Sequence, residues 1–457
     1  MHNRAGMNPP HGPRGPLRGG ALLSFPRHPE AFLRVSRKYG DLASFRVGNQ
    51  QFVVINHPDL VREVFVTKQD SFVKGWGPVA GNTVMGHGLL TSEGALHRRQ
   101  RRIVLPALHR QRLEEYANAV VRHARQLVDG WRDAPSSNIL ADARRITMLV
   151  IAETLLGTDI APADAARVSH ALDIIFRRFA GRMHAFAGPL RRLRVRSAKI
   201  GAEAGRELRA LATSLMDARR EQRGDDLVSL LLDTRDDAGD PLPDALIVDE
   251  IVTMFVTGHE TIALALTWAW LRLARDARAQ AQLDAELDAV LGGREPSFDD
   301  LRQMPYAQGV IAESLRLHPP QWMLGRRATE PVSVGGVDLP AGVNVLLSLY
   351  TLHRDARWFD DAEAFRPERW AAGVEKSAAP FTYLPFGLSI RRCVGEGFAW
   401  METTLLLALT ASRLRALPLP PGELGMEPLI VLRPEAKARM AFVARAPEAA
   451  SAQSSAP

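Results

Sequence analysis

The stretch FGLSIRRCVG, residues 386–395, contains the only cysteine of this 457-residue chain. A single cysteine is most often a small buried hydrophobic residue. Here two arginines precede Cys393, and Gly387 and Gly395 flank it with residues that tolerate positive φ and close backbone approach. The apolar pattern after Gly395 predicts a helix, so the sulfur would face a helix N-terminus. These surroundings favour a thiolate, which acts as a nucleophile or as a metal ligand.

The composition indicates a soluble globular protein with a large core, because 46% of the residues are hydrophobic and 24% are charged. One cysteine excludes an internal disulfide and fits a reducing compartment, so we expect a cytoplasmic protein. The net charge of +7 suits an acidic partner. No nucleic-acid-reading motif accompanies the arginines, so nucleic acid is not expected. No run of about 18 uncharged apolar residues predicts a membrane anchor.

We expect a single domain over residues 21–446, because no composition shift divides this stretch. Residues 1–20 read as a flexible lead, and residues 447–457 as a disordered tail. Periodicity predicts helices over 30–38, 58–66, 94–233 and 243–275, and strands over 42–47, 51–55, 332–339 and 343–349. The chain is therefore predicted to be mainly α with small β-sheets.

The longest helical pattern, 243–275, contains the polar insertion TGHET at 257–261. Burying an unpaired polar group costs on the order of a few kcal/mol, so the insertion needs a reason. Gly258 lowers helix propensity, and threonine hydroxyls compete for backbone carbonyls. The pattern is compatible with a kinked core helix and with a local widening at a functional site.

Two charged pairs also have helical spacing. His97 and Arg101 lie four residues apart, and Glu313 and Arg316 lie three apart, so each pair shares one face of its helix. Taken alone, each pair is equally typical of an exposed helix surface.

Together these motifs resemble those of the cytochrome P450 family. The cysteine stretch matches the family's haem-binding loop at five positions: Phe386, Gly387, Arg391, Cys393 and Gly395. Ser389 stands where the family usually has glycine, and Thr257 stands where its central helix has alanine or glycine. The resemblance implies the P450 fold, with haem between the central helix and the helix that follows Cys393.

By this resemblance, the cofactor is haem b, with the Cys393 thiolate as the axial ligand of iron, which favours O–O cleavage. The implied cofactor contacts are Phe386 and Gly387 of the loop, and His97, Arg101, Arg326 and Arg391 at the propionates. Thr261 would hydrogen-bond the activated dioxygen, and Glu260 would relay protons. Glu313, Arg316 and Arg369 would form a buried network that supports the loop.

The implied reaction is hydroxylation or epoxidation of a lipophilic molecule of terpenoid, fatty acid or polyketide type. The expected substrate pocket consists of Trp76, Val84, Met85, Met254, Thr257, Trp322 and Met323. Electrons would come from an acidic ferredoxin or flavodoxin docked on the basic residues Arg98, Arg99, Arg102 and Arg392. We expect the enzyme to be a monomer.

Three alternatives stay open. A haem-thiolate isomerase or dehydratase would act on peroxides without dioxygen, although Glu260 and Thr261 argue against it. A haem-based sensor or carrier would bind haem without turnover. A thiol enzyme without haem would use Cys393 as a nucleophile.

Overall fold

The computed structural model describes nine segments of the chain: residues 29–47, 50–75, 85–134, 136–184, 191–236, 238–374, 376–417, 424–435 and 438–445. Two expected pocket residues, Trp76 and Val84, lie outside these segments. The predicted lead 1–20 and tail 447–457 also lie outside them.

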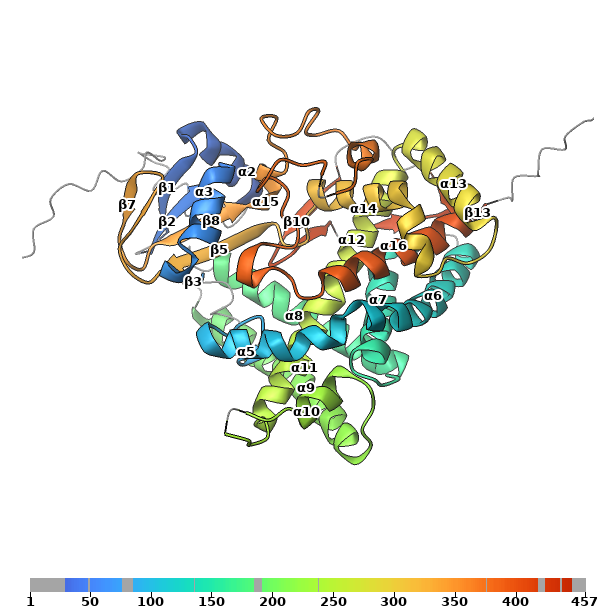
Figure 1. Cartoon of the computed structure of the whole chain (residues 1–457), viewed down its shortest axis with the longest axis horizontal. Coiled ribbons are helices and arrows are strands. Elements are labelled where there is room, and N and C mark those ends of the chain that lie inside the picture. Colours follow the sequence, from blue (N-terminus) through green and yellow to red (C-terminus); the bar gives the residue numbers. More distant parts are fainter. Residues whose placement is uncertain are drawn as a thin grey trace, which may run out of the picture.

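Helices dominate the described part of the chain (Figure 1). The helices are α2 (Pro29–Ser36), α3 (Pro58–Arg62), α5 (Gly94–Val104), α6 (Arg110–Asp133), α7 (Ile139–Thr154), α8 (Pro162–His184), α9 (Arg191–Glu221), α10 (Leu227–Asp233), α11 (Asp244–Gly258), α12 (Glu260–Leu273), α13 (Ala277–Leu291), α14 (Pro305–Leu317), α15 (Leu349–Leu352) and α16 (Glu396–Arg413). The prediction of a mainly α fold with small sheets is confirmed.

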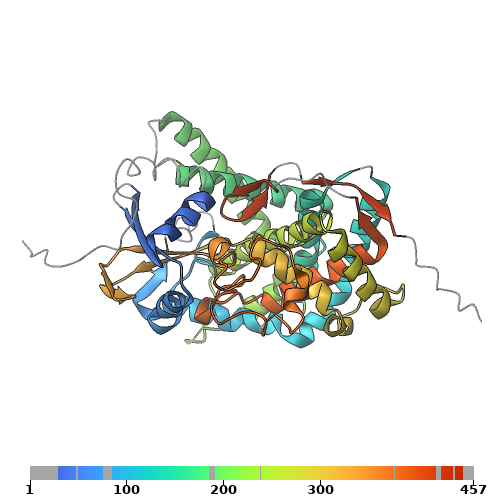
Figure 2. The ribbon, with the colours of Figure 1, turned by 90° about the horizontal axis from the view of Figure 1, so that it is seen from above.

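A five-stranded sheet lies at one end of the molecule, at the left in Figures 1 and 2. Its order is β1 (Leu42–Val47), β2 (Gln50–Ile55), β8 (Asn344–Ser348), β5 (Met323–Ala328) and β3 (Phe72–Lys74). Strands β2 and β8 are parallel, with Val53 opposite Val345, and the other neighbours are antiparallel. The smaller pairs are β6 (Val332–Val334) with β7 (Val337–Leu339), β10 (Met426–Pro428) with β11 (Leu432–Pro434), β12 (Arg439–Met440) with β4 (Ser137–Asn138), and β13 (Phe442–Ala444) with β9 (Leu414–Ala416).

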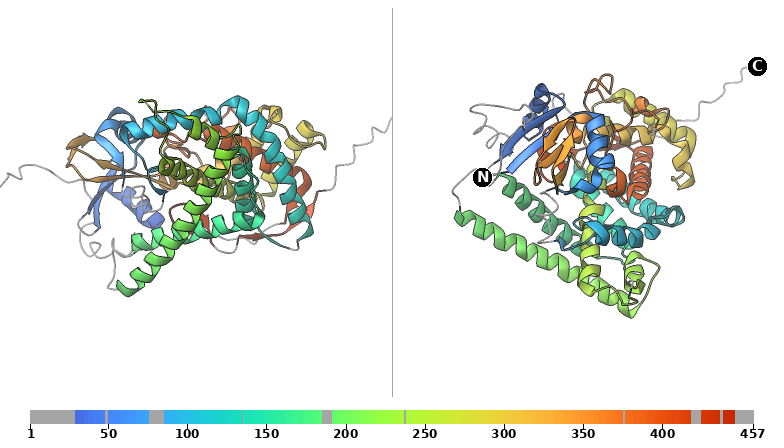
Figure 3. Two further views of the ribbon diagram at one scale, coloured as in Figure 1. Left: turned by 90° about the horizontal axis from the view of Figure 1, so that it is seen from below. Right: turned by 60° about the vertical axis from the view of Figure 1, so that its left-hand side comes forward.

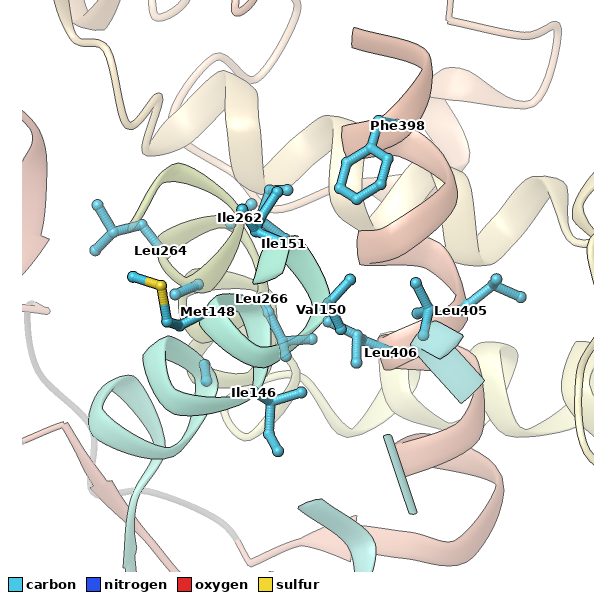
Figure 4. Close-up of a cluster of buried hydrophobic side chains, with 14 of the residues drawn as sticks. Ile146, Met148, Val150, Ile151, Ile262, Leu264, Leu266, Phe398, Leu405 and Leu406 are labelled. Atoms are coloured by element: carbon cyan, nitrogen blue, oxygen red, sulfur yellow. The ribbon is translucent and has the colours of Figure 1, made fainter. Parts of the chain in front are cut away.

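Helices α11 and α12 form the centre of the helical part. α12 packs against α7, α14 and α16, and α9 packs on α11. Figure 4 shows the core that results: Ile146, Met148, Val150 and Ile151 of α7 face Ile262, Leu264 and Leu266 of α12 and Phe398, Leu405 and Leu406 of α16. The long helices α8 and α9 pack together along the outside (Figures 2 and 3).

The predicted helix 243–275 is interrupted at His259, where α11 ends and α12 begins, within the polar insertion for which the sequence allowed a kink or a local widening. The His259 ring nitrogen Nδ1 lies 2.5 Å from the Phe255 carbonyl, the acceptor that the His259 N–H would use in an α-helix. Thr147 of α7 donates to the His259 carbonyl at 3.0 Å. At this break, side-chain hydrogen bonds therefore replace the backbone hydrogen bonds of a continuous helix.

The strand predictions were partly wrong. Residues 332–339 form a hairpin, because Gly335 and Gly336 have φ of 58° and 75° and reverse the chain between β6 and β7. Strands β3 and β5 were not predicted at all. β3 is three residues long, and β5, with the sequence MLGRRA, has little strand propensity, so both depend on pairing within the sheet.

One stretch of the described chain, Asp244–Leu273, is long and apolar enough to cross a membrane. Because 83% of its most apolar window is buried inside the protein, it has the character of a core helix.

Candidate active site

A cavity of ≈ 540 Å³ lies between the central helix, the start of α16 and the sheet. Cys393, Thr261 and Arg326 all line it, although they are far apart in the sequence. The cavity therefore joins the cysteine loop, the polar insertion and the sheet in one site.

The cysteine loop is a tight turn that leads into α16. The Cys393 N–H donates to the Phe386 carbonyl at 2.8 Å, and Gly387 has a φ of 70°. Gly395 caps α16, so Cys393 lies just before the N-terminus of a helix, as predicted. The sulfur is accessible from the cavity, although the residue lies deep within the protein.

Burial raises the pKa of Cys393 to about 11, and the backbone N–H of Gly395 and the charges of Arg101 and Arg392 only partly oppose it. Burial thus outweighs the arginines and the helix N-terminus, which the sequence suggested would favour the thiolate. A thiolate at this position needs a further positive charge, which a coordinated metal ion supplies.

Ser389, which replaces the usual glycine of the loop, keeps a glycine-like conformation. Its φ is 59°, in the left-handed region, which costs a non-glycine residue roughly 1–2 kcal/mol. Its hydroxyl donates to Oε1 of Gln69 at 2.7 Å, a hydrogen bond that contributes about 0.5–1.5 kcal/mol. The bond offsets much of the conformational cost and ties the loop to the segment before β3.

Four basic side chains predicted to meet propionates all line the cavity: His97 and Arg101 of α5, Arg326 of β5, and Arg391. Nη1 of Arg101 donates to the Arg392 carbonyl at 2.6 Å, and the Arg326 guanidinium lies 4.5 Å from the centre of the Phe65 ring.

These basic side chains are poorly solvated. Burial, together with the charges of Lys74 and Arg391, lowers the pKa of His97 to about 4, so its ring is neutral at pH 7 and offers an N–H donor but no charge. Burial, with the charge of Arg391, lowers the pKa of Arg326 to about 10.

Lys74, at the end of β3, is a further member of this cluster that the sequence did not reveal. Its ammonium is buried and donates to the carbonyls of Leu89 at 3.0 Å and Ser92 at 2.7 Å. Burial, with the charge of Arg391, lowers its pKa to about 7. A lone lysine at the end of a three-residue strand carries no sequence signal that would have marked it.

This cluster fits the propionates of a haem. Two carboxylates lie near it among the described residues: Glu93, which pairs with Arg391, and Glu250, whose charge acts on Lys74. Nη1 of Arg391 is buried and has no hydrogen-bond partner among the residues that the structure describes. Desolvated cations with an open donor require anions, and two carboxylates at one edge of a flat cofactor would supply them. The Cys393 sulfur, in the same cavity, is the ligand type that haem iron takes in haem-thiolate proteins.

Thr257 and Thr261 line the cavity from the central helix, and the Thr261 hydroxyl donates to the Thr257 carbonyl at 2.9 Å. Glu260 does not line it. The Glu260 carboxylate is 2% exposed and accepts from Nε and Nη2 of Arg144, both at 2.7 Å, and from Nε of Arg433 at 2.9 Å. Although burial opposes them, the two guanidinium groups lower the pKa of Glu260. Sequence spacing gave no sign of either arginine as a partner.

Glu313, Arg316 and Arg369 form a network on α14. Arg316 donates to both Glu313 oxygens, at 2.8 and 2.7 Å, and both side chains are fully buried. Nε of Arg369 lies 3.5 Å from Glu313, and the Trp370 indole donates to Glu313 at 2.9 Å. Arg316 also donates to the carbonyls of His353, Ala362 and Ala364. The network therefore fixes the stretch from His353 to Trp370 to α14.

The five expected pocket residues that the structure describes all line the cavity: Met85, Met254, Thr257, Trp322 and Met323. Ile175 and Phe176 of α8, and Leu429 and Ile430 between β10 and β11, line it as well and were not foreseen. These four are apolar residues without a motif, and only the packing of distant segments brings them to the cavity.

Comparison with known proteins agrees with this geometry. A family model described as "Cytochrome P450" matches residues 9–442. The chain is 36% identical over 421 residues to cyclooctatin synthase of Streptomyces melanosporofaciens, covering 91% of this chain and 92% of that protein.

Two further Streptomyces proteins are similar to the chain. Cyclooctat-9-en-7-ol 5-monooxygenase of S. melanosporofaciens is 33% identical over 404 residues, covering 88% of each chain. Pentalenene oxygenase of S. avermitilis is 31% identical over 427 residues, covering 92% of this chain and 94% of that protein. With its cysteine loop, cation cluster and central-helix motif around one cavity, the chain belongs to the cytochrome P450 family of haem-thiolate monooxygenases.

Proposed function

We propose that this chain is a terpenoid monooxygenase that binds haem b through Cys393 and inserts one oxygen atom into a lipophilic substrate. The observation that carries the proposal is the single cavity that joins the Cys393 sulfur, the cation cluster and Thr261. The names of the related Streptomyces proteins, which include a monooxygenase of a cyclic alcohol and an oxygenase of pentalenene, favour a terpenoid over a fatty acid or a polyketide.

Haem, when bound, supplies the activation of dioxygen with electrons from a redox partner. The chain's own residues do the rest. Arg101, Arg326 and Arg391 would neutralise the propionates, His97 would donate a hydrogen bond to them, and the apolar lining would exclude water and orient the substrate. The Thr261 hydroxyl donates its own proton to the Thr257 carbonyl, so its oxygen would accept a hydrogen bond from the group that carries a proton to the reacting centre.

We propose that Glu260 relays protons and that it does so when its carboxylate exchanges an arginine partner for water. Its carboxylate is held by Arg144 and Arg433, and Arg433 also pairs with Asp173 of α8 at 2.6 Å. Arg144 is 17% exposed, whereas Arg433 is 3% exposed. Water can therefore compete for the carboxylate on the Arg144 side, from which Glu260 can receive protons.

Thr261→Ala is expected to uncouple electron use from product formation. The substitution removes the hydroxyl oxygen that would position the proton-carrying group but leaves the cavity and the cysteine loop intact. NADH consumption should continue while product falls by roughly 10-fold or more and peroxide rises, as expected when proton delivery is impaired.

The matched control is Thr267→Ala. Thr267 is another threonine of α12 that donates to a carbonyl four residues back, at 2.7 Å, and it does not line the cavity. If Thr261→Ala keeps the wild-type ratio of product to NADH, Thr261 has only a structural role.

For the electron donor we propose an acidic ferredoxin or flavodoxin, and for the protein a cytoplasmic monomer. Arg98 and Arg102 of α5 are exposed, as is Arg392 beside the cysteine loop, whereas Arg99 is only partly exposed. Arg101 on the same helix donates to the Arg392 carbonyl, so α5 lies next to the cysteine loop, where Arg392 itself pairs with Glu396.

Arg98→Glu and Arg102→Glu are expected to slow reduction by such a donor by roughly 10-fold or more at low salt, because they remove electrostatic steering. The difference from wild type should shrink at high salt, where the charges are screened. Stopped-flow reduction at several salt concentrations measures the effect, and Arg46→Glu on β1 at the far edge of the sheet is the control. Rates that depend on neither salt nor the two reversals would contradict a docking role.

A further inference from the structure

Thr257 is the position at which the central-helix motif departs from the family pattern, and it places a hydroxyl in the cavity. The residue lines the cavity one helical turn before Thr261 and is partly exposed to it. Met254, Thr257 and Thr261 are spaced three and four residues apart and share one face of the helix.

The Thr257 hydroxyl can accept a hydrogen bond from a ligand in the cavity, but it has no free proton to donate to that ligand. It donates its proton to the Thr253 carbonyl at 2.8 Å. A hydroxyl has one proton and two lone pairs, so with the proton committed to the backbone the oxygen can only accept from a ligand.

The helix cannot easily turn this hydroxyl away. The next residue, Gly258, packs so closely on α7 that a Cβ there would lie 2.7 Å from Cδ1 of Ile151. Since neighbouring residues on a helix point about 100° apart, contact at Gly258 fixes the direction in which Thr257 points.

Away from the basic cluster, the lining of the cavity is mostly apolar, and Met85, Met254, Trp322 and Met323 contribute to it. Gln321 also lines the cavity, and its amide nitrogen donates to the Met323 carbonyl at 2.6 Å. Thr253 lines it too, but it is 2% exposed, its hydroxyl donates to the Asp249 carbonyl at 2.8 Å, and it packs against Gly88, where a Cβ would lie 2.1 Å from the Thr253 hydroxyl oxygen.

We propose that Thr257 is a specificity-determining residue that accepts a hydrogen bond from a substrate hydroxyl, so that the preferred substrate is a lipophilic alcohol and not the matching hydrocarbon. This rests on the proposed function, because it concerns the substrate of the same cavity. A hydrocarbon would remove the Thr257 oxygen from water without giving it a donor, whereas an alcohol satisfies it. The hydrogen bond would also fix which carbon of the substrate faces the reacting centre.

The test compares dissociation constants for matched pairs of alcohol and hydrocarbon: cedrol with cedrane, and borneol with bornane. Thr257→Val removes the hydroxyl and keeps the side-chain shape, Thr257→Ser keeps the hydroxyl, and Thr267→Val removes an equivalent hydroxyl away from the cavity. Isothermal titration calorimetry measures all four proteins with both members of each pair.

We expect Thr257→Val to weaken binding of the alcohol relative to its hydrocarbon by about 10-fold, the effect of losing one hydrogen bond in a dry site. Thr257→Ser and Thr267→Val should keep the wild-type ratio. The proposal would be overturned if Thr257→Val left the ratio of the alcohol and hydrocarbon dissociation constants unchanged, or if Thr267→Val changed that ratio equally. It would also be overturned if the protein bound none of the four compounds.

The carbon-monoxide spectrum of each reduced protein separates this proposal from the proposed function. If the thiolate-type band is present and the ratio is unchanged, only the role of Thr257 fails. If the wild-type protein lacks that band, the proposed function itself fails.

Discussion

Replacing Cys393 with Ala is expected to abolish the haem-thiolate spectrum and all monooxygenase turnover. Cys393 is the only cysteine in the sequence, so no other thiol can take its place. The cation cluster around Arg391 should still attract the propionates, so the variant should retain at most weakly bound haem. The reduced, carbon-monoxide-bound spectrum and the haem content of the purified protein measure the two effects.

Ser389→Gly is the matched control, because it changes the same loop without touching the sulfur and restores the residue that suits a φ of 59°. It should keep the thiolate band. A Cys393→Ala protein that kept this band would refute the ligand assignment.

Glu313→Gln is expected to destabilise the fold by about 3–5 kcal/mol, because it leaves the fully buried Arg316 guanidinium without its compensating charge. The same change weakens the contacts of Glu313 with Arg369 and Trp370. Urea unfolding, followed by circular dichroism, measures the loss.

The control for this prediction is Glu207→Gln. Glu207 pairs with Arg167 at 3.0 Å, and both side chains are exposed, so the loss should stay within about 1 kcal/mol. If both substitutions cost the same, the buried Glu313 network does not stabilise the fold more than a surface ion pair does.

The parts of the site that depend on local spacing were predictable. His97 and Arg101 reach the cavity together because four residues make one helical turn, and the loop around Cys393 is a short contiguous motif. The polar insertion at 257–261 predicted a disturbed helix, and the helix does break there, at His259.

The parts that depend on contacts between distant segments were not predictable. Arg144 and Arg433 reach Glu260 from positions 116 and 173 residues away in the chain. Strands β3 and β5 form because neighbouring strands pair with them, and the pairing of β3 also determines the position of Lys74. The pKa of Cys393 depends on burial, and the arginines beside it in the sequence do not reveal how deep the loop lies.

The source of the oxygen atom in the product distinguishes a monooxygenase from the alternatives most directly. The protein would be supplied with NADH, a ferredoxin and its reductase, heavy-isotope dioxygen, and the terpenoid that it binds most tightly, and the products would be analysed by mass spectrometry. Each hydroxylated or epoxidised product should carry one heavy oxygen atom. Products whose new oxygen comes only from water, or no oxygenated product from any ligand that binds, would contradict the proposed monooxygenase activity.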